Sequence, residues 1–299
     1  MIKYLFTFCF FVALYSAHSQ DILAKLEKEY PNKPVYELAT FKTTRIGLGH
    51  SIEVRKKGAL EISAFNRFWN TENSTKQRFL ADKLSNRFGL NYAITDLLTI
   101  GAGYTSFDEI SDGFLKYKIF RQQKDAKKAP VSITLLQGVS HRTKADIENP
   151  LYAEDNIINS NVYSFVSQVL IARKFSRKFS AQITPTYIHR TDNFLTDQSN
   201  NQFAVGLGAR YKLGGHVSLV SEYYYVANPA SGVTTFDPFL IGINWELSHL
   251  LLQFHMTNTR HFAEDAFITQ TRNNFNFHDG NFHFGFNAIF VLHSKKNKL

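Results

Sequence analysis

Most of this chain alternates apolar and polar residues with a period of two, which constrains its fold more than any other feature. The clearest segment is 202–213, in which one face is apolar and the other is polar. The apolar face carries Phe203, Val205, Leu207, Ala209, Tyr211 and Leu213. Successive side chains of a β-strand point to opposite faces, so the pattern predicts strands with one apolar and one polar face.

Thirteen segments show this alternation. They are 45–55, 60–69, 87–94, 98–105, 114–120, 131–142, 161–173, 180–190, 202–213, 216–225, 239–247, 250–256 and 282–291. A chain that enters and leaves a barrel on one side must cross it an even number of times. We therefore expect about 14 strands, with residues 33–42 as the additional one. Twelve strands are the alternative, in which two of the weaker segments are loop or plug.

Two features favour a membrane barrel over a soluble β-sandwich. The polar faces are rich in Gly, Ser, Thr and Arg, as in a lumen, and short turns alternate with long loops such as 143–160 and 259–280. After the N-terminal segment, no apolar run reaches the ~18 residues of a spanning helix. The predicted fold is all-β, a transmembrane antiparallel up-and-down β-barrel.

The N-terminus has the features of a secretory signal peptide. Lys3 precedes an apolar run, and Ala17-His18-Ser19 offers small residues for cleavage before Gln20. We expect a signal peptide at residues 1–19, a periplasmic segment at 20–33, and a barrel at 34–299 in the outer membrane of a Gram-negative bacterium. Cys9 is the only cysteine and lies in the signal, so the mature chain is expected to form no disulfide.

The charge of the chain is moderately basic. Its 34 basic and 25 acidic residues give a net charge of +9, which falls to +8 without Lys3. An exported protein seldom meets nucleic acid, and no clustered basic helix or stacking platform accompanies the charge, so nucleic acid is not an expected partner. The expected partners are outer-membrane lipids and small solutes, and a monomer is favoured.

The alternation places ten cations and four anions on inward faces. They are Arg45, Arg55, Arg67, Arg87, Lys116, Lys118, Arg142, Arg190, Arg210 and Lys212, with Glu53, Glu61, Glu222 and Glu246. A cation-lined lumen favours anions, so the leading hypothesis is a pore or transporter for small solutes, with a preference for anions and no cofactor. The alternative is a plugged barrel with a structural or surface-interaction role, in which these charges pair across the lumen. Residues 21–42 or 143–160 folded into the lumen would indicate the plugged form.

The histidines are the remaining candidates for metal binding or catalysis. His50, His255 and His283 lack the close spacing of a preformed metal site, so no metal is predicted. A lipid-acting enzyme, the third hypothesis, would need a serine and a histidine to converge. The residue types occur at His50-Ser51 and Ser140-His141. Adjacent strand residues point to opposite faces, so we expect no enzymatic activity.

Several short motifs are spread along nearly the whole mature chain. They are Thr40-Phe41-Lys42-Thr43-Thr44-Arg45 with Gly49-His50-Ser51, Tyr92-Ala93-Ile94-Thr95-Asp96, Asp112-Gly113-Phe114-Leu115-Lys116-Tyr117-Lys118, and Phe267-Ile268-Thr269-Gln270-Thr271. In these motifs the chain resembles an uncharacterised outer-membrane β-barrel family of Bacteroidetes-type bacteria, a domain family of unknown function. The resemblance implies a barrel in the outer membrane, but it implies no established activity and no functional residues.

Overall fold

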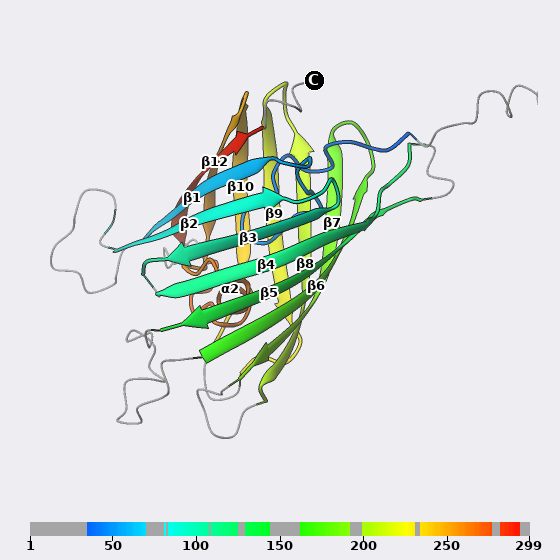
Figure 1. Ribbon diagram of the computed structural model, residues 1–299. Coiled ribbons are helices and arrows are strands. Elements are labelled where there is room, and N and C mark those ends of the chain that lie inside the picture. Colours follow the sequence, from blue (N-terminus) through cyan, green and yellow to red (C-terminus); the bar gives the residue numbers. More distant parts are fainter. Residues whose placement is uncertain are drawn as a thin grey trace, which may run out of the picture.

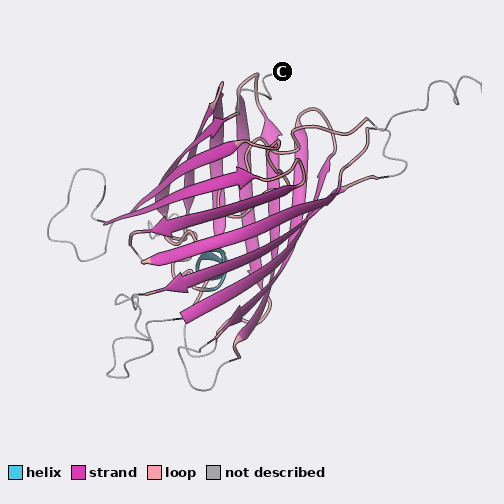
Figure 2. Ribbon diagram, viewed as in Figure 1, coloured by secondary structure: helices cyan, strands magenta, loops and turns pink. Residues whose placement is uncertain are grey.

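Twelve antiparallel strands form a closed barrel in the computed structural model (Figure 1). The structure describes residues 35–69, 81, 83–107, 109–124, 129–143, 162–191, 199–230, 234–276 and 282–293. The strands are β1 (Leu60–Trp69), β2 (Lys83–Ala93), β3 (Leu98–Thr105), β4 (Ile110–Phe120), β5 (Ser132–Arg142), β6 (Val162–Lys174), β7 (Phe179–Arg190), β8 (Asn201–Lys212), β9 (Val217–Val226), β10 (Phe239–Leu247), β11 (Leu250–Thr257) and β12 (His283–Leu292). The helix α2 (Glu264–Thr269) lies inside the ring of strands (Figure 2).

Each strand pairs with its neighbours in sequence, and β1 closes the barrel on β12. The up-and-down topology is thus confirmed. Twelve of the thirteen predicted segments are strands, so the twelve-stranded alternative is confirmed and the main expectation of about 14 strands is wrong. We call the end with the β2–β3, β4–β5, β6–β7, β8–β9 and β10–β11 connections the turn end, and the opposite end the loop end. Both described chain ends, near Val35 and His293, lie at the turn end.

The two faces of the wall follow the predicted alternation. On β2, for example, Phe88 and Leu90 point outward and are 63% and 56% exposed, whereas Arg87 and Asn91 point inward and are buried. Burial of apolar side chains in lipid stabilises such an outward face, while the inward groups require polar partners. Among the described residues, no helix is long and apolar enough to cross a membrane.

Residues 45–55 are not a strand of the wall. Residues 45–53 belong to a longer segment, residues 40–53, that enters the lumen from the turn end, and Ile46, Leu48 and Ile52 are buried there instead of facing lipid. The alternation is the same in both cases, because a hairpin packed against one side of a lumen also has an apolar and a polar face. The sequence pattern alone does not separate these two environments.

A tight reversal shapes this segment. Ile46 N donates to Gly49 O at 3.0 Å, and Ser51 N donates to Thr44 O at 2.9 Å, so residues 43–51 form a short hairpin. We call residues 43–51 the hairpin. Of the predicted additional strand at 33–42, residues 35–39 run along the barrel rim and 40–42 lead into the hairpin, so that expectation is wrong for its described part. Residues 33 and 34 lie outside the described residues.

A second segment enters the lumen from the loop end. Residues 258–272 follow β11 and include α2, whose residues Phe267 and Ile268 are fully buried. We call residues 40–53, which contain the hairpin, and residues 258–272 together the plug. Of the predicted plug segment 21–42, residues 40–42 belong to the plug and 35–39 run along the rim, whereas 21–34 lie outside the described residues. The other predicted segment, 143–160, lies outside the described residues except for Thr143.

Candidate functional site: the plugged lumen

The plug has an apolar side, which packs against β6–β10. Phe41, Ile46, Leu48 and Ile52 share one buried cluster with Phe267 and Ile268 of α2. Wall residues of the same cluster are Val166, Leu170, Ala172, Ile188, Ala204, Val220, Tyr224, Val226 and Leu240. Each fully buried aliphatic or aromatic side chain contributes about 1.5–3 kcal/mol, so this side holds the plug firmly.

The opposite side of the lumen, formed by β1–β5, is polar and charged. Arg87 of β2 pairs with Asp112 of β4 through Nε at 2.8 Å and Nη2 at 2.5 Å. The guanidinium lies against Gly103 of β3, where a Cβ atom would overlap it, so glycine is needed at that position for close approach. Ser85 and Thr105, whose buried hydroxyls have no partner among the described residues, lie beside it.

A carboxylate of the wall holds the tip of the hairpin. Glu222 on β9 accepts hydrogen bonds from Leu48 N at 2.5 Å and Gly49 N at 3.1 Å. The Tyr224 hydroxyl lies 3.4 Å from the same carboxylate, and a Cβ at Gly49 would overlap that hydroxyl. The turn therefore requires glycine at position 49, and its orphan N–H groups are satisfied by the carboxyl oxygens of Glu222.

The two plug segments meet at a charged contact in the lumen. Arg45 Nη1 of the hairpin lies 2.8 Å from Glu264 Oε1 at the start of α2, and His50 Nε2 lies 3.3 Å from the same oxygen. The His50 ring packs edge-on against Phe114 of β4, with 4.4 Å between ring centroids. The contact joins a segment that enters from the turn end to one that enters from the loop end.

Burial sets the protonation of this contact. It lowers the pKa of His50 well below its usual value of 6.5, and the charges of Arg45 and Lys116 add to the effect. Burial also raises the pKa of Glu264, while Arg45 opposes that shift. His50 is therefore a neutral imidazole at physiological pH.

Wall side chains bind the backbone carbonyls of the hairpin segment. Lys116 Nζ donates to Thr44 O at 3.1 Å and Glu53 O at 2.7 Å. Gln253 Nε2 donates to Ile46 O at 2.7 Å. Lys118 Nζ lies 3.4 Å from the Glu53 carboxylate. The plug thus presents oxygen atoms to the wall cations.

Other wall cations hold the α2 segment. Arg142 Nη2 donates to Gln270 Oε1 at 2.9 Å, and Arg190 Nη2 donates to Asp265 O at 3.2 Å. The guanidinium of Arg67 lies 4.2 Å from the ring centroid of Phe262 and donates to the carbonyl of Thr259 at 3.3 Å. These contacts give neutral oxygen acceptors and an aromatic face to cations that the sequence places inside the barrel.

Most of the predicted inward residues do lie inside. The wall residues in the lumen are Arg67, Arg87, Lys116, Lys118, Arg142, Arg190, Arg210, Glu61 and Glu222. Lys212 and Glu246 lie half-buried toward the turn end, where Glu246 contacts Lys42 at 2.9 Å and Arg210 at 3.4 Å. Arg45, Glu53 and Arg55 precede β1 and are not wall residues, which corrects their predicted place on a strand. Arg55 pairs with Glu61 at 2.6 Å.

Sequence reasoning missed three anions of the lumen, Asp112, Glu264 and Asp265. Asp112 is inward on β4, which begins at Ile110, four residues before the predicted segment. Extending the alternation backward from Lys116 would have found it. Glu264 and Asp265 lie on a predicted loop, and no periodic signal marks them. With these anions the lumen is closer to charge balance than the strands alone indicate.

The histidine pairs do not form catalytic sites. Ser51 Oγ donates to Thr43 O at 2.5 Å, and Ser140 Oγ donates inward to Asp265 Oδ1 at 2.8 Å. His141 instead stacks with Tyr163, with 4.4 Å between ring centroids. Among the described residues, no group of three or more His, Cys, Asp or Glu side chains is arranged to hold a metal ion.

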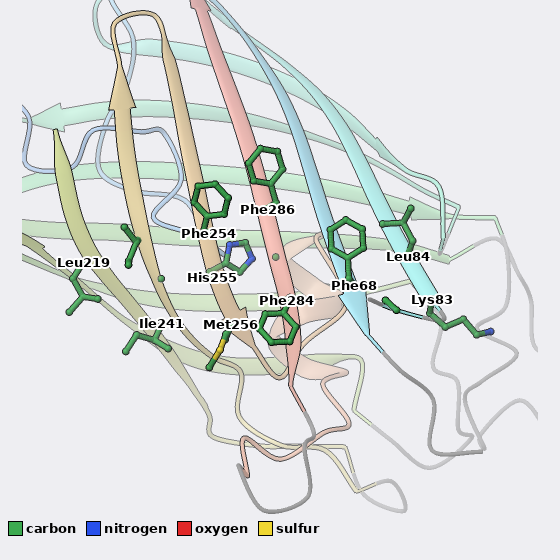
Figure 3. A pocket seen from close by; sticks show the side chains of 14 residues that line it. Phe68, Lys83, Leu84, Leu219, Ile241, Phe254, His255, Met256, Phe284 and Phe286 are labelled. Atoms are coloured by element: carbon green, nitrogen blue, oxygen red, sulfur yellow. The ribbon is translucent and has the colours of Figure 1, made fainter. Parts of the chain in front are cut away.

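The outer wall carries an apolar groove of about 880 Å³ over β9–β12, β1 and β2 (Figure 3). Phe254, Phe284 and Phe286 project from β11 and β12 along it, together with Met256 and Ile241 (Figure 3). These side chains belong to the outward face of the strands. The groove is thus part of the surface that faces lipid, and the chemistry-bearing side chains gather in the lumen.

Comparison with solved structures gives outer-membrane barrels of low sequence identity. An outer membrane channel from Pseudomonas putida F1 is 16% identical, with a TM-score of 0.47 over 81% of this chain and 98% of that chain. The KdgM porin in complex with disordered oligogalacturonate is 5% identical, with a TM-score of 0.47 over 79% and 99%. The NanC porin is 9% identical, with a TM-score of 0.45 over 79% and 99%.

Comparison with curated proteins finds no match. The sequence model of a family described as "Membrane bound beta barrel domain (DUF5777)" matches residues 41–292. The expected outer-membrane localisation and the resemblance to a barrel family of unknown function are confirmed, while the bacterial group stays a prediction. The chain belongs to the DUF5777 family of membrane-bound β-barrel domains.

Proposed function

We propose that this outer-membrane barrel is a gated channel for small anionic solutes, closed by the plug. The observation that carries the proposal is that the two sides of the plug make different kinds of contact with the wall. Its apolar side rests on β6–β10, and its other side meets β1–β5 through ion pairs and hydrogen bonds.

The polar contacts between the plug and β1–β5 support conduction, because in them wall cations bind oxygen atoms as they would bind those of an anion. Lys116 donates to the carbonyl oxygens of Thr44 and Glu53, and Lys118 pairs with the Glu53 carboxylate. An anionic solute would replace these oxygens with its own once the hairpin moves. Buried ion pairs add little net stability compared with apolar packing, so a filler selected for stability alone would not need them.

A second candidate function is that of a permanently plugged structural barrel. The apolar side of the plug favours it, because displacing residues 40–53 exposes Ile46, Leu48 and Ile52 at about 1.5–3 kcal/mol each. In this case the buried cations serve only to hold the plug. Neither candidate function involves a catalytic step.

Conductance in planar lipid bilayers separates the two functions. The test compares the wild type with a variant in which residues 41–53 are replaced by a Gly/Ser linker of equal length. A gated channel predicts brief, rare openings for the wild type and sustained, anion-selective current for the variant. Heat-modifiable electrophoretic mobility and circular dichroism verify that both proteins are folded barrels.

Selectivity is tested on the background of the linker variant. Lys116→Gln with Lys118→Gln should lower the anion preference, measured as the reversal potential in a salt gradient. Lys56→Gln with Lys57→Gln, in an exposed turn at the rim, is the matched control and should change it less. A folded linker variant that passes no current would overturn the channel function and support the structural one.

A further inference from the structure

The turn-end rim of β6 and β7 combines cations with exposed aromatic side chains. The connection between the strands carries Arg177 and Lys178 between Phe175 and Phe179, and Arg173 lies just before it on β6. Phe175 is 58% exposed and Phe179 is 39% exposed. We call these five residues the basic-aromatic rim.

The basic-aromatic rim has a defined shape. Phe175 N donates to Phe179 O at 3.0 Å, and Ser176 Oγ accepts from Lys178 N at 3.2 Å and from Phe179 N at 3.0 Å. The two phenyl rings lie 5.7 Å apart, and the Arg173 guanidinium lies 5.3 Å from the Phe175 ring centroid. The turn therefore holds its cations beside a fixed apolar surface.

The basic-aromatic rim lacks acidic neighbours. The chain has no acidic residue between Asp155 and Asp192, a stretch that includes both strands. Glu37, which approaches this rim from the N-terminal segment, pairs with Lys174 at 3.2 Å. Within the part of the chain that the structure describes, no carboxylate forms an ion pair with Arg173, Arg177 or Lys178.

The position of this rim in the membrane follows from the barrel. Short turns of bacterial outer-membrane barrels lie on the periplasmic side, so the turn end is at the inner leaflet. Phe179 and Arg173 are outward-facing by the strand alternation, and Arg177 and Lys178 are exposed at the turn. The cations thus lie at the depth of lipid headgroups, and the phenyl rings lie beside the acyl chains.

We propose that the basic-aromatic rim binds the phosphate groups of anionic phospholipids in the inner leaflet. Guanidinium groups bind phosphate oxygens in bidentate geometry, and each interfacial cation increases binding to an anionic surface about fivefold. The exposed aromatic side chains favour a lipid over the anionic polymers of the periplasm, since those polymers offer no hydrocarbon to cover phenyl rings. The rim lies outside the lumen, so this inference is independent of conduction.

The experiment measures which lipids the barrel retains. The folded protein is reconstituted in vesicles of phosphatidylethanolamine mixed with phosphatidylglycerol and extracted in mild detergent, and its bound lipids are quantified by mass spectrometry. We expect phosphatidylglycerol to be enriched over its share in the vesicle. Arg177→Gln with Lys178→Gln removes two such cations and should reduce that enrichment by about 25-fold.

Lys56→Gln with Lys57→Gln is the matched control, because it removes two adjacent cations from another turn of the same rim. This variant should keep the enrichment. Absence of enrichment in the wild type, or equal loss in both variants, would overturn the site. Phe175→Ser should reduce lipid retention although all charges are present. Unchanged retention in Phe175→Ser, together with loss of binding to isolated peptidoglycan in the Arg177/Lys178 variant, would show that the cations bind peptidoglycan instead.

Discussion

Arg45 and Glu264 form an ion pair of 2.8 Å inside the barrel, although they belong to segments that enter the lumen from opposite ends. Arg45 lies on the hairpin and Glu264 begins α2. This pair joins the two segments directly, beside the apolar cluster that they share, so movement of one segment is transmitted to the other. It follows that the two segments should open together.

The first prediction concerns this pair. Arg45→Ala leaves the buried Glu264 carboxylate without its cation, and breaking such a pair costs about 3–5 kcal/mol. Hydrogen exchange should therefore quicken in both the hairpin and residues 258–272. Arg45→Ala combined with Glu264→Gln should be milder than Arg45→Ala alone, because no uncompensated charge remains. Additive effects of the two changes would show that the segments open separately.

The second prediction concerns the anchor of the hairpin tip. Glu222→Gln replaces one of the two carboxyl oxygens that accept backbone N–H groups by an amide nitrogen, which cannot accept, and should weaken docking by about 1–3 kcal/mol. The hairpin should then exchange its amide protons faster, and channel openings should become more frequent. Tyr224→Phe is the control, because it removes a hydroxyl 3.4 Å from the carboxylate and leaves both N–H contacts intact. The idea fails if the two variants behave alike.

The third prediction concerns space at the hairpin tip. Gly49→Ala places a Cβ against the Tyr224 hydroxyl, and overpacking of this kind costs about 1–3 kcal/mol. We expect a loosened hairpin and more frequent openings. Gly49→Ala with Tyr224→Phe should recover most of the closed state, since the hydroxyl is the closest atom. Gly215→Ala, with open space around its Cβ, should have no effect on conductance.

The wall of the barrel could be predicted from sequence because lipid and lumen impose opposite polarity on successive residues. Phe88 and Leu90 against Arg87 and Asn91 show how plainly that contrast appears. The plug could not be recognised, because Ile46 and Leu48 find an apolar surface on β6–β10 that is built from distant residues such as Leu170 and Leu240. The alternation within a segment does not tell whether its apolar face packs against lipid or against the inner wall of the barrel.

The prediction of the lumen charges from sequence was also incomplete. Strand alternation identified Arg87 and Lys116, but their partners come from outside the predicted strands. Asp112 lies on an extension of β4, and Glu53 lies on a segment that folds back into the barrel. A count of strand charges therefore overstates how cationic the closed lumen is.

The last prediction concerns pH, through His50 and Glu264. Burial lowers the pKa of His50, so the closed plug holds the neutral ring; its contribution is full above 6.5 and is lost as the pH falls from there toward the lowered pKa. Arg45, Lys116 and Arg87 face the ring and oppose its protonation, whereas the Thr44 backbone favours it and the Glu264 carboxylate lies 3.3 Å from Nε2. Acidification should therefore loosen the hairpin.

The contribution of Glu264 to the stability of the closed plug depends on pH in the opposite direction. Its raised pKa means that the closed plug favours the protonated acid, so this group stabilises the plug below its usual value of 4.5 and loses that contribution as the pH rises through the raised pKa. Protection factors of residues 43–51 against hydrogen exchange, corrected for the base-catalysed intrinsic rate, should fall in the wild type as the pH is lowered from about 7.5 to 5.5. His50→Gln should remove this response and Glu264→Gln should enlarge it, because each variant leaves only the other group to titrate. A His50→Gln barrel with the full acid response would place the titrating group elsewhere.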